Sequence, residues 1–318
     1  MRIKRYGVSL GMALAALVLM LFTPSLLPGD IQAENGVLLL GERDGYRLYA
    51  GETPPPGSAR FFDRETLFSG LLLYVGRDAP LPADLPVQQA RDVRSMVKLY
   101  IPAAARVALS EKTIYALCDL VRENPLVHTW IMAGMRSPAE QQAMRKAAFA
   151  GYQATMTIEQ ALEKARADIP DSGQSEHQLN TCFDIRLDGL HDWSLDDPMA
   201  RTADGRWLLE NAWRYGFIRR YPPEKAEITG VRNEAAHWRY VGAHHAAAMG
   251  TADWCLEEYL RALAEYGALR LETPAGKSVW LLCAPLTEGA ASFIIPEGWI
   301  YEVSADNLGR AVCAMFRP

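Results

Sequence analysis

Two histidines of this sequence lie close to acidic residues. His177 is followed seven residues later by Asp184, and His237 lies three residues after Glu234. Two imidazoles and one carboxylate form a three-ligand set that suits a catalytic zinc, whose fourth position stays open for water. Glu234 would then lie near the metal without having to bind it, where a general base for the attacking water is useful. We therefore expect His177, Asp184 and His237 to bind one metal ion.

Each of these residues also has an ordinary structural interpretation. A single histidine is more often a hydrogen-bonded imidazole of the core or the surface than a metal ligand. Asp184 could cap the end of a strand or pair with Arg186, and Glu234 could be a solvated loop carboxylate. The spacing His-x6-Asp is not a common metal motif, and Glu-x-x-His occurs by chance. Spacing alone therefore leaves both interpretations open.

A third segment, residues 133–141, places Arg136 between an expected strand and the N-terminus of an expected helix. A guanidinium beside free backbone N–H groups forms a natural pocket for a carboxylate. Gly134 would allow another part of the backbone to approach closely. The alternative is that Arg136 only pairs with a surface acid.

Helix-start signals and apolar patterns predict the elements that must position these residues. Ser110, Ser137 and Thr157 are expected N-caps, the last two in capping boxes, with Gly151 and Pro170 ending the second and third helices. Further helices are expected over residues 207–215 and after a cap at Thr251. Asp-Gly at 44–45 indicates a hairpin. Strands are expected over residues 37–40, 46–49, 71–75, 126–132, 182–187, 237–241, 278–283, 292–295, 299–303 and 311–316.

Composition excludes several classes of protein. The chain has 318 residues, a formal net charge of −5 and 49% hydrophobic residues, which is ordinary globular usage. A mainly disordered or collagen-like chain is excluded, and with no strongly basic stripe there is no reason to expect a nucleic-acid partner. Five scattered cysteines without a C-x-x-C pair do not indicate a disulfide framework. We expect mostly free thiols, with one bridge possible in the C-terminal part.

Residues 1–30 have the pattern of a targeting segment. Three basic residues among the first five precede an apolar run over residues 8–22, which indicates a secretory signal or an uncleaved membrane anchor. Extended to residue 27, the run has about 20 residues, barely enough to span a bilayer. No clear small-x-small cleavage site follows Phe22, which favours the anchor, and the basic flank places the rest outside the membrane. A buried N-terminal helix is the alternative.

Together and in this order, the three segments resemble the motifs of VanY-type D-alanyl-D-alanine carboxypeptidases, a family of zinc metallopeptidases. That family shows S-G-Y-R-S-x-x-x-Q, then S-x-H-x-x-G-x-A-x-D, then E-P-W-H-x-R-Y-V-G. The corresponding residues here are 133–141, 175–184 and 234–242, and the likeness extends over roughly residues 70–245. The resemblance implies that zinc is the metal and that Glu234 is the general base. The zinc ligands it implies are His177, Asp184 and His237.

The resemblance also implies a substrate and an organisation of the chain. Arg136 would hold the terminal carboxylate of a peptidoglycan stem peptide, with Ser175 and Gln141 helping to position the peptide. The activity would be removal of the C-terminal D-alanine in the bacterial cell envelope. We expect a monomer that is either anchored to the membrane through its N-terminal segment or secreted. The fold would be α+β, with helices packed on a small antiparallel sheet. The parts would be a targeting segment (1–30), a strand-rich segment (31–69), the catalytic domain (70–265) and a small all-β appendage (266–318).

The sequence departs from the family motifs at several positions. Asn180 replaces the motif glycine, and Cys182 replaces the motif alanine, where a small buried hydrophobe is the ordinary interpretation. Met135 replaces a tyrosine, and Ala235 and Ala236 replace Pro-Trp, which removes aromatic side chains from the expected pocket wall. Two other functions therefore stay open: an L,D-carboxypeptidase acting on tetrapeptide stems, and a non-catalytic wall-binding module of the same fold. A zinc ion that only braces the fold is a further alternative, but a closed structural site needs neither Glu234 nor Arg136.

Overall fold

The structure is a computed structural model that describes residues 33–34, 36–85, 89–96, 103–104, 106–190, 197–232 and 234–318. The targeting segment expected over residues 1–30 lies outside these ranges. None of the helices within them combines the length and the apolar character that crossing a bilayer requires. The described chain mixes helices with several antiparallel sheets, which confirms the expected mixed composition of the fold.

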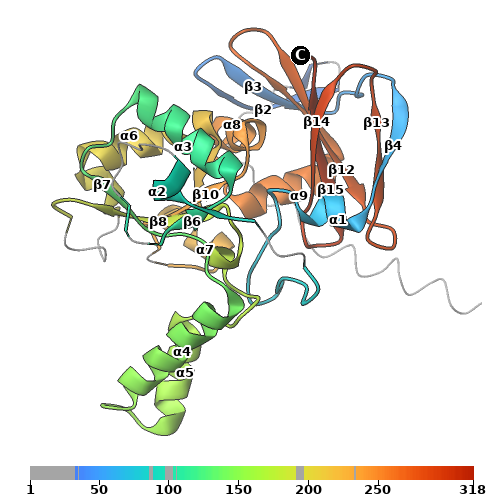
Figure 1. Cartoon of the computed structure of the whole chain (residues 1–318). Helices are drawn as coiled ribbons and strands as arrows, with labels where there is room; N and C mark the ends of the chain where they lie inside the picture. Colours follow the sequence, from blue (N-terminus) through green and yellow to red (C-terminus); the bar gives the residue numbers. More distant parts are fainter. Residues whose placement is uncertain are drawn as a thin grey trace, which may run out of the picture.

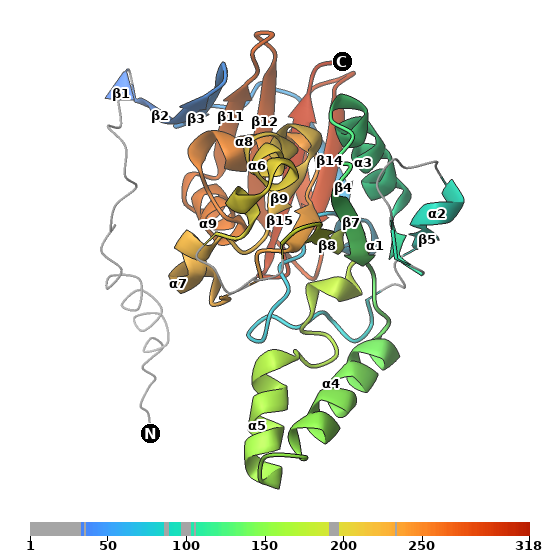
Figure 2. The same cartoon turned by 90° about the vertical axis from the view of Figure 1, so that its left-hand side faces the viewer.

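The largest sheet contains strands from both ends of the described chain. It has seven antiparallel strands in the order β1-β2-β3-β11-β12-β15-β14, and β3 of the N-terminal part pairs with β11 of the C-terminal part (Figures 1 and 2). The segments expected separately over residues 31–69 and 266–318 therefore share one sheet. Its strands are β1 (Ala33–Glu34), β2 (Val37–Arg43), β3 (Tyr46–Ala50), β11 (Ala268–Glu272), β12 (Ser278–Pro285), β14 (Ile300–Ala305) and β15 (Arg310–Phe316).

The hairpin between β2 and β3 is the one that the Asp-Gly pair predicts. Asp44 has φ 52° and Gly45 has φ 80°. Positive φ at both central residues is what a two-residue hairpin turn with the right twist requires. Two small sheets have two strands each: β4 (Ser58–Phe62) pairs with β13 (Ala291–Ile295), and β5 (Arg91–Asp92) pairs with β6 (Ala108–Leu109).

A four-stranded antiparallel sheet carries the histidine motifs. Its order is β7-β8-β10-β9, formed by β7 (Thr129–Ala133), β8 (Cys182–Leu187), β10 (His237–Tyr240) and β9 (Phe217–Arg219). Successive side chains of a strand point to opposite faces. Phe183 and Ile185 of β8 join the apolar cluster that includes Leu117 and Leu120 of the adjacent helix α3. Asp184 of β8 must therefore point to the face opposite this cluster.

The helices begin largely where capping residues predict them. Ser110, Ser137 and Thr157 cap α3, α4 and α5, and the last two form complete capping boxes. The α4–α5 pair projects from the body of the molecule in both views (Figures 1 and 2). The α-helices are α1 (Arg64–Phe68), α2 (Val93–Met96), α3 (Glu111–Glu123), α4 (Pro138–Tyr152), α5 (Ile158–Asp168), α6 (Ala203–Asn211), α7 (Ala226–Thr229), α8 (Ala243–Ala252) and α9 (Leu256–Tyr266). The 3-10 turns are η1 (Glu176–Gln178), η2 (Met199–Arg201), η3 (Ala212–Tyr215) and η4 (Pro223–Lys225).

Three local expectations were wrong or incomplete. Thr251 lies inside α8, and Cys255 caps α9 instead. α8 itself was not expected, because residues 245–249 are all buried and a helix buried all round shows no apolar stripe. Residues 71–75 do not form a strand. Two of their carbonyl groups, those of Leu71 and Leu73, accept hydrogen bonds from the Arg239 guanidinium.

The five cysteines are all free thiols, so the one possible bridge expected in the C-terminal part does not form. Burial raises the pKa of Cys255 and Cys313, in each case to about 12. These thiols are therefore protonated at neutral pH and behave as small apolar side chains.

The burial of His245 in α8 predicts that stability depends on pH. His245 is 4% exposed, its Nδ1 lies 2.6 Å from the Tyr259 hydroxyl, and burial lowers its pKa from 6.5 to about 3. The unfolded chain therefore binds this proton below about pH 6.5, whereas the folded protein does not until about pH 3. Burial of His245 therefore lowers the free energy of unfolding only below about pH 6.5, and the loss grows as the pH falls towards 3. At pH 5 the loss is about 2 kcal/mol.

Urea unfolding at pH 7 and pH 5 measures this loss in the wild type and in His245→Gln. The wild-type free energy of unfolding should fall by about 2 kcal/mol more than that of the variant. The exposed His128 provides the control, since His128→Gln should keep the wild-type difference. Equal pH dependence of the wild type and His245→Gln would contradict the prediction.

Candidate active site

The register between β8 and β10 brings together the aspartate and one histidine of the motifs. His237 of β10 lies directly opposite Asp184 of β8. Its Nδ1 is 2.9 Å from Asp184 Oδ1. The turn η1, which leads into β8, places His177 Nε2 at 3.1 Å from the same oxygen. Side chains from two segments that are distant in sequence therefore meet on the sheet face opposite the α3 cluster.

The three ligand atoms have a spacing that fits a tetrahedral metal. All of them lie within 4.8 Å of one another. Two ligands at 2.0–2.1 Å from a tetrahedral zinc are about 3.3 Å apart, close to the separations of 2.9 and 3.1 Å here. The side chains of His177 and His237 are 6% and 3% exposed, whereas that of Asp184 is 32% exposed. The site is therefore open to solvent at the aspartate.

Both imidazoles are held from behind through their second ring nitrogen. His177 Nδ1 is 2.8 Å from the Gly134 carbonyl oxygen, and His237 Nε2 is 3.3 Å from Glu176 Oε2. Such partners fix the tautomer and the ring orientation of metal-bound histidines. An added Cβ at Gly134 would lie 2.5 Å from the Ala108 carbonyl oxygen, so only glycine allows this close approach. The donor set and its supporting contacts fit Zn²⁺.

The protonation states of two of the three side chains favour binding of a cation. Burial opposes ionisation of Asp184, but the hydrogen bonds with the two imidazoles outweigh it and hold the pKa of this carboxyl well below its usual range. Burial lowers the pKa of His177, which favours the neutral imidazole. An ionised carboxylate and a neutral imidazole are the forms that bind a divalent metal. Burial lowers the pKa of the third side chain, His237, but hydrogen bonds with Asp184, Cys182 and Glu176 outweigh it and hold this pKa well above its usual value, so a metal must displace a proton there.

Arg136 lies beside this group at the start of α4. Its backbone N–H donates to the His177 carbonyl, and its Nη1 donates to Gln141 Oε1 at 2.8 Å. Burial lowers the pKa of Arg136, whereas the negative charges of Asp184 and Glu234 raise it. Both carboxylates therefore lie within electrostatic range of the guanidinium. Its buried Nε–H has no acceptor among the described residues. A buried donor without a partner costs free energy, and an anionic ligand would supply the acceptor.

The other predicted site residues lie around this group. Gln141 is fully buried and its amide also donates to the Pro170 carbonyl, so it orients Arg136 from behind. Ser175 is buried and directly precedes η1. Glu234 is exposed in the turn before β10, and its carbonyl accepts the His237 backbone N–H. Its side chain is thus accessible to solvent, three residues before His237.

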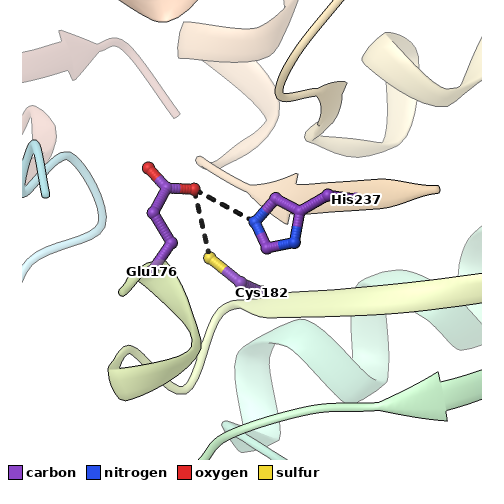
Figure 3. Close-up of side chains that lie close together, drawn as sticks. All are labelled: Glu176, Cys182 and His237. Atoms are coloured by element: carbon purple, nitrogen blue, oxygen red, sulfur yellow. Dashed lines mark hydrogen bonds and ion pairs between the residues drawn. The ribbon is translucent and has the colours of Figure 1, made fainter. Parts of the chain in front are cut away.

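Two residues that contact His237 were not predicted from the sequence. Glu176 lies beside His177 in the second motif, and its carboxylate points at the His237 ring in Figure 3. Tyr221 stacks on the same ring, with centroids 5.4 Å apart and an interplanar angle of 26°. Adjacency to His177 was the one sequence signal for Glu176, and no periodic pattern pointed to Tyr221.

The motif departures have simple structural consequences. Asn180 does not adopt a positive φ, so the left-handed freedom of the motif glycine is not used here. Its side chain donates to the Gln89 carbonyl at 2.7 Å. Cys182 is fully buried on β8, and its Sγ lies 3.6 Å from Glu176 Oε2.

Comparison with known proteins identifies relatives of this region. Residues 110–243 match the family model described as VanY, D-alanyl-D-alanine carboxypeptidase. A D-alanyl-D-alanine carboxypeptidase of Enterococcus faecalis is 36% identical over 190 residues, which are 59% of this chain and 65% of that protein. The chain thus spans slightly less than two thirds of the length of this curated relative.

Solved structures extend the comparison. A mutant of the vancomycin resistance D,D-pentapeptidase VanY, in complex with Zn(II), is 34% identical and covers 59% of this chain and 98% of its own, with a TM-score of 0.46. The vancomycin resistance D,D-dipeptidase VanXYg, in complex with a D-Ala-D-Ala phosphinate analogue, is 22% identical and covers 82% of this chain and 99% of its own. Its TM-score of 0.65 shows a shared fold. Residues 110–243 therefore form a domain of the VanY family of D-alanyl-D-alanine carboxypeptidases.

Proposed function

We propose that this protein is a zinc-dependent carboxypeptidase that removes the C-terminal D-alanine from peptidoglycan stem peptides in the cell envelope. The observation that carries the proposal is the meeting of His177, Asp184 and His237 beside Arg136, whose buried Nε–H has no acceptor among the described residues. The match of residues 110–243 to the VanY family model and the name of the E. faecalis relative support it. Attachment to the membrane through residues 1–30 stays a prediction.

The residues of the chain divide the reaction between them. A zinc ion held by His177, Asp184 and His237 would supply a Lewis acid for the scissile carbonyl and its attacking water. Glu234, exposed beside the ligands, accepts the proton of the water as the water oxygen attacks the carbonyl carbon. It then gives that proton to the departing amine nitrogen as the C–N bond breaks. The products are a new terminal carboxylate and free D-alanine.

Arg136 makes the reaction specific for a chain end. The terminal carboxylate of the peptide accepts hydrogen bonds from the guanidinium, which Gln141 holds in place. A peptide without a free terminus leaves this buried donor unpaired, and such a loss costs more than a missing apolar contact. Cleavage is therefore restricted to the last residue.

The metal assignment predicts the effect of removing the shared ligand. Asp184→Asn should lower zinc affinity by more than about 100-fold, because loss of a ligand exceeds the 10- to 100-fold cost of losing a supporting contact. Competition with a chromophoric chelator measures the affinity. Asp188→Asn, a change just beyond the end of the same strand, should bind zinc like the wild type. Wild-type affinity in Asp184→Asn would refute the ligand assignment.

The general-base assignment predicts loss of turnover with the metal retained. The zinc-loaded wild type should release D-alanine from a synthetic pentapeptide ending in D-Ala-D-Ala, and Glu234→Gln should reduce kcat by about 10²- to 10⁴-fold. Zinc content should stay equimolar in both proteins. Glu227→Gln, a change of another exposed carboxylate, is the control. Release from the tetrapeptide alone would favour the L,D-carboxypeptidase, and no release from either peptide would contradict the proposal.

The role of Arg136 predicts a loss that depends on the substrate terminus. Arg136→Met should lower kcat/KM for the free-acid pentapeptide by about 10- to 100-fold, because a charge-assisted hydrogen bond is lost. The same peptide with a C-terminal amide should be a poor substrate for both proteins and should show little difference between them. A similar loss on both peptides would show that Arg136 does not bind the carboxylate.

A further inference from the structure

Glu176 is a buried carboxylate that takes no part in the proposed reaction. Its side chain is 1% exposed, and four donors surround it. Oε1 accepts from Arg220 Nε at 2.8 Å and from Arg239 Nη1 at 2.6 Å. Oε2 faces His237 Nε2 at 3.3 Å and the Cys182 thiol at 3.6 Å (Figure 3). The carboxylate is thus fixed by two guanidinium groups while its other oxygen meets the imidazole.

The position of Glu176 determines which nitrogen of His237 is free for a metal. A neutral imidazole has one N–H and one lone pair. An ionised carboxylate only accepts hydrogen bonds, so Glu176 requires the hydrogen on Nε2. The lone pair is then on Nδ1, which faces Asp184 at 2.9 Å. With the opposite tautomer, Nδ1–H would point into the metal site and Nε2 would face a carboxylate without a hydrogen between them.

We infer that Glu176 is a positioning residue, which holds His237 with Nδ1 directed at the metal, and that Glu257 supports it through Arg220. The inference rests on the proposed metal site and extends it to residues that bind neither metal nor substrate. The role of Glu176 depends on its own contacts, and the role of Glu257 depends on the contacts of Arg220.

Glu176, Cys182 and His237 also form a compact group of potential ligands, but their surroundings exclude a second metal there. Arg220 and Arg239 are 1% and 0% exposed, and both guanidinium groups already bind Glu176. A divalent cation at this place would lie beside two buried positive charges, which repel it at low effective dielectric. The group therefore supports the ligand His237 from behind.

Glu257 of α9 connects this cluster to a part of the chain beyond residues 110–243. Its two carboxylate oxygens accept from Arg220 Nη1 and Nη2 at 2.9 and 2.8 Å, a bidentate pair. The charges of Glu176 and Glu257 balance those of Arg220 and Arg239. Loss of the Glu257 charge would leave an excess positive charge behind His237, which disfavours a cation in the site and loosens Arg220 from its fixed orientation.

The tautomer can be observed directly in the zinc-loaded wild-type protein. Proton–nitrogen correlation spectra of the ¹⁵N-labelled imidazole rings show which nitrogen carries hydrogen. We expect hydrogen on Nε2 of His237 and none on Nδ1. Hydrogen on Nδ1 would overturn the inference while leaving zinc binding intact. Failure of the wild type to bind zinc would instead overturn the proposed function, and the inference with it.

Variants then measure how much each carboxylate contributes. Zinc affinity, measured with a competing chromophoric chelator, should fall about 10- to 100-fold in Glu176→Gln. Zinc affinity should fall roughly 2- to 30-fold in Glu257→Gln, because this variant keeps Glu176 as the acceptor for His237 and changes only the charge balance. Glu258→Gln is the matched control on α9, because Glu258 pairs with Lys225 and not with Arg220, and should bind zinc like the wild type.

Near-ultraviolet circular dichroism establishes that each variant is folded, and the visible spectrum of the cobalt-loaded proteins reports the geometry of the ligands. An altered cobalt spectrum is expected for Glu176→Gln, and a wild-type spectrum for Glu258→Gln. Wild-type zinc affinity in a folded Glu176→Gln would overturn the positioning role. Equal affinities of Glu257→Gln and Glu258→Gln would overturn the contribution of Glu257. If Glu176→Gln does not fold, the tautomer in the wild type still decides the first part.

Discussion

The site depends on the pairing register of two short strands. His237 faces Asp184 across β8 and β10, and the neighbouring pair, Trp238 opposite Phe183, lies in the apolar cluster on the other face. A slip of one residue would turn the histidine into the core and the tryptophan towards the metal. Because burial of the two aromatic side chains is favourable only in the observed register, the core on one face fixes the ligand geometry on the other.

A second constraint connects the proposed metal ligands to Arg136, the proposed carboxylate-binding residue. The His177 side chain contacts the Gly134 carbonyl, and the Arg136 backbone N–H donates to the His177 carbonyl. These two hydrogen bonds tie the end of β7 to η1, although more than 40 residues separate the two segments and the α4–α5 pair lies between them. The distance between the proposed metal site and Arg136 is thereby fixed by contacts of the backbone, and the projecting α4–α5 pair does not disturb it.

Short-range signals accounted for much of what the sequence predicted. The caps at Ser110, Ser137 and Thr157, the Asp-Gly hairpin and the bounds of β8 all depend on residues within one element, and each appears as expected. The Glu176 cluster depends instead on contacts such as Arg220 with Glu176, 44 residues apart, and Arg239 with Leu71, 168 residues apart. A charged residue in a sequence is ordinarily solvated, so nothing in its spacing indicates that it is buried and paired. The pairing of β3 with β11 was missed because it also joins distant parts of the chain, with Leu269 opposite Ala50.

The buried charges behind His237 are better explained by orientation than by stability. Taking two carboxylates and two guanidinium groups out of water costs several kcal/mol per ion, and their mutual attraction repays this only with good geometry and further hydrogen bonds. Apolar side chains of similar volume would stabilise the fold at least equally, but they could not accept a hydrogen bond from an imidazole. Further hydrogen bonds hold both guanidinium groups in position. Arg239 donates to the Leu71 and Leu73 carbonyls, and Arg220 donates to the Glu257 carboxylate. Residues 71–73 and α9 therefore contribute to the same end: they keep one carboxylate immobile so that one nitrogen of His237 faces the metal.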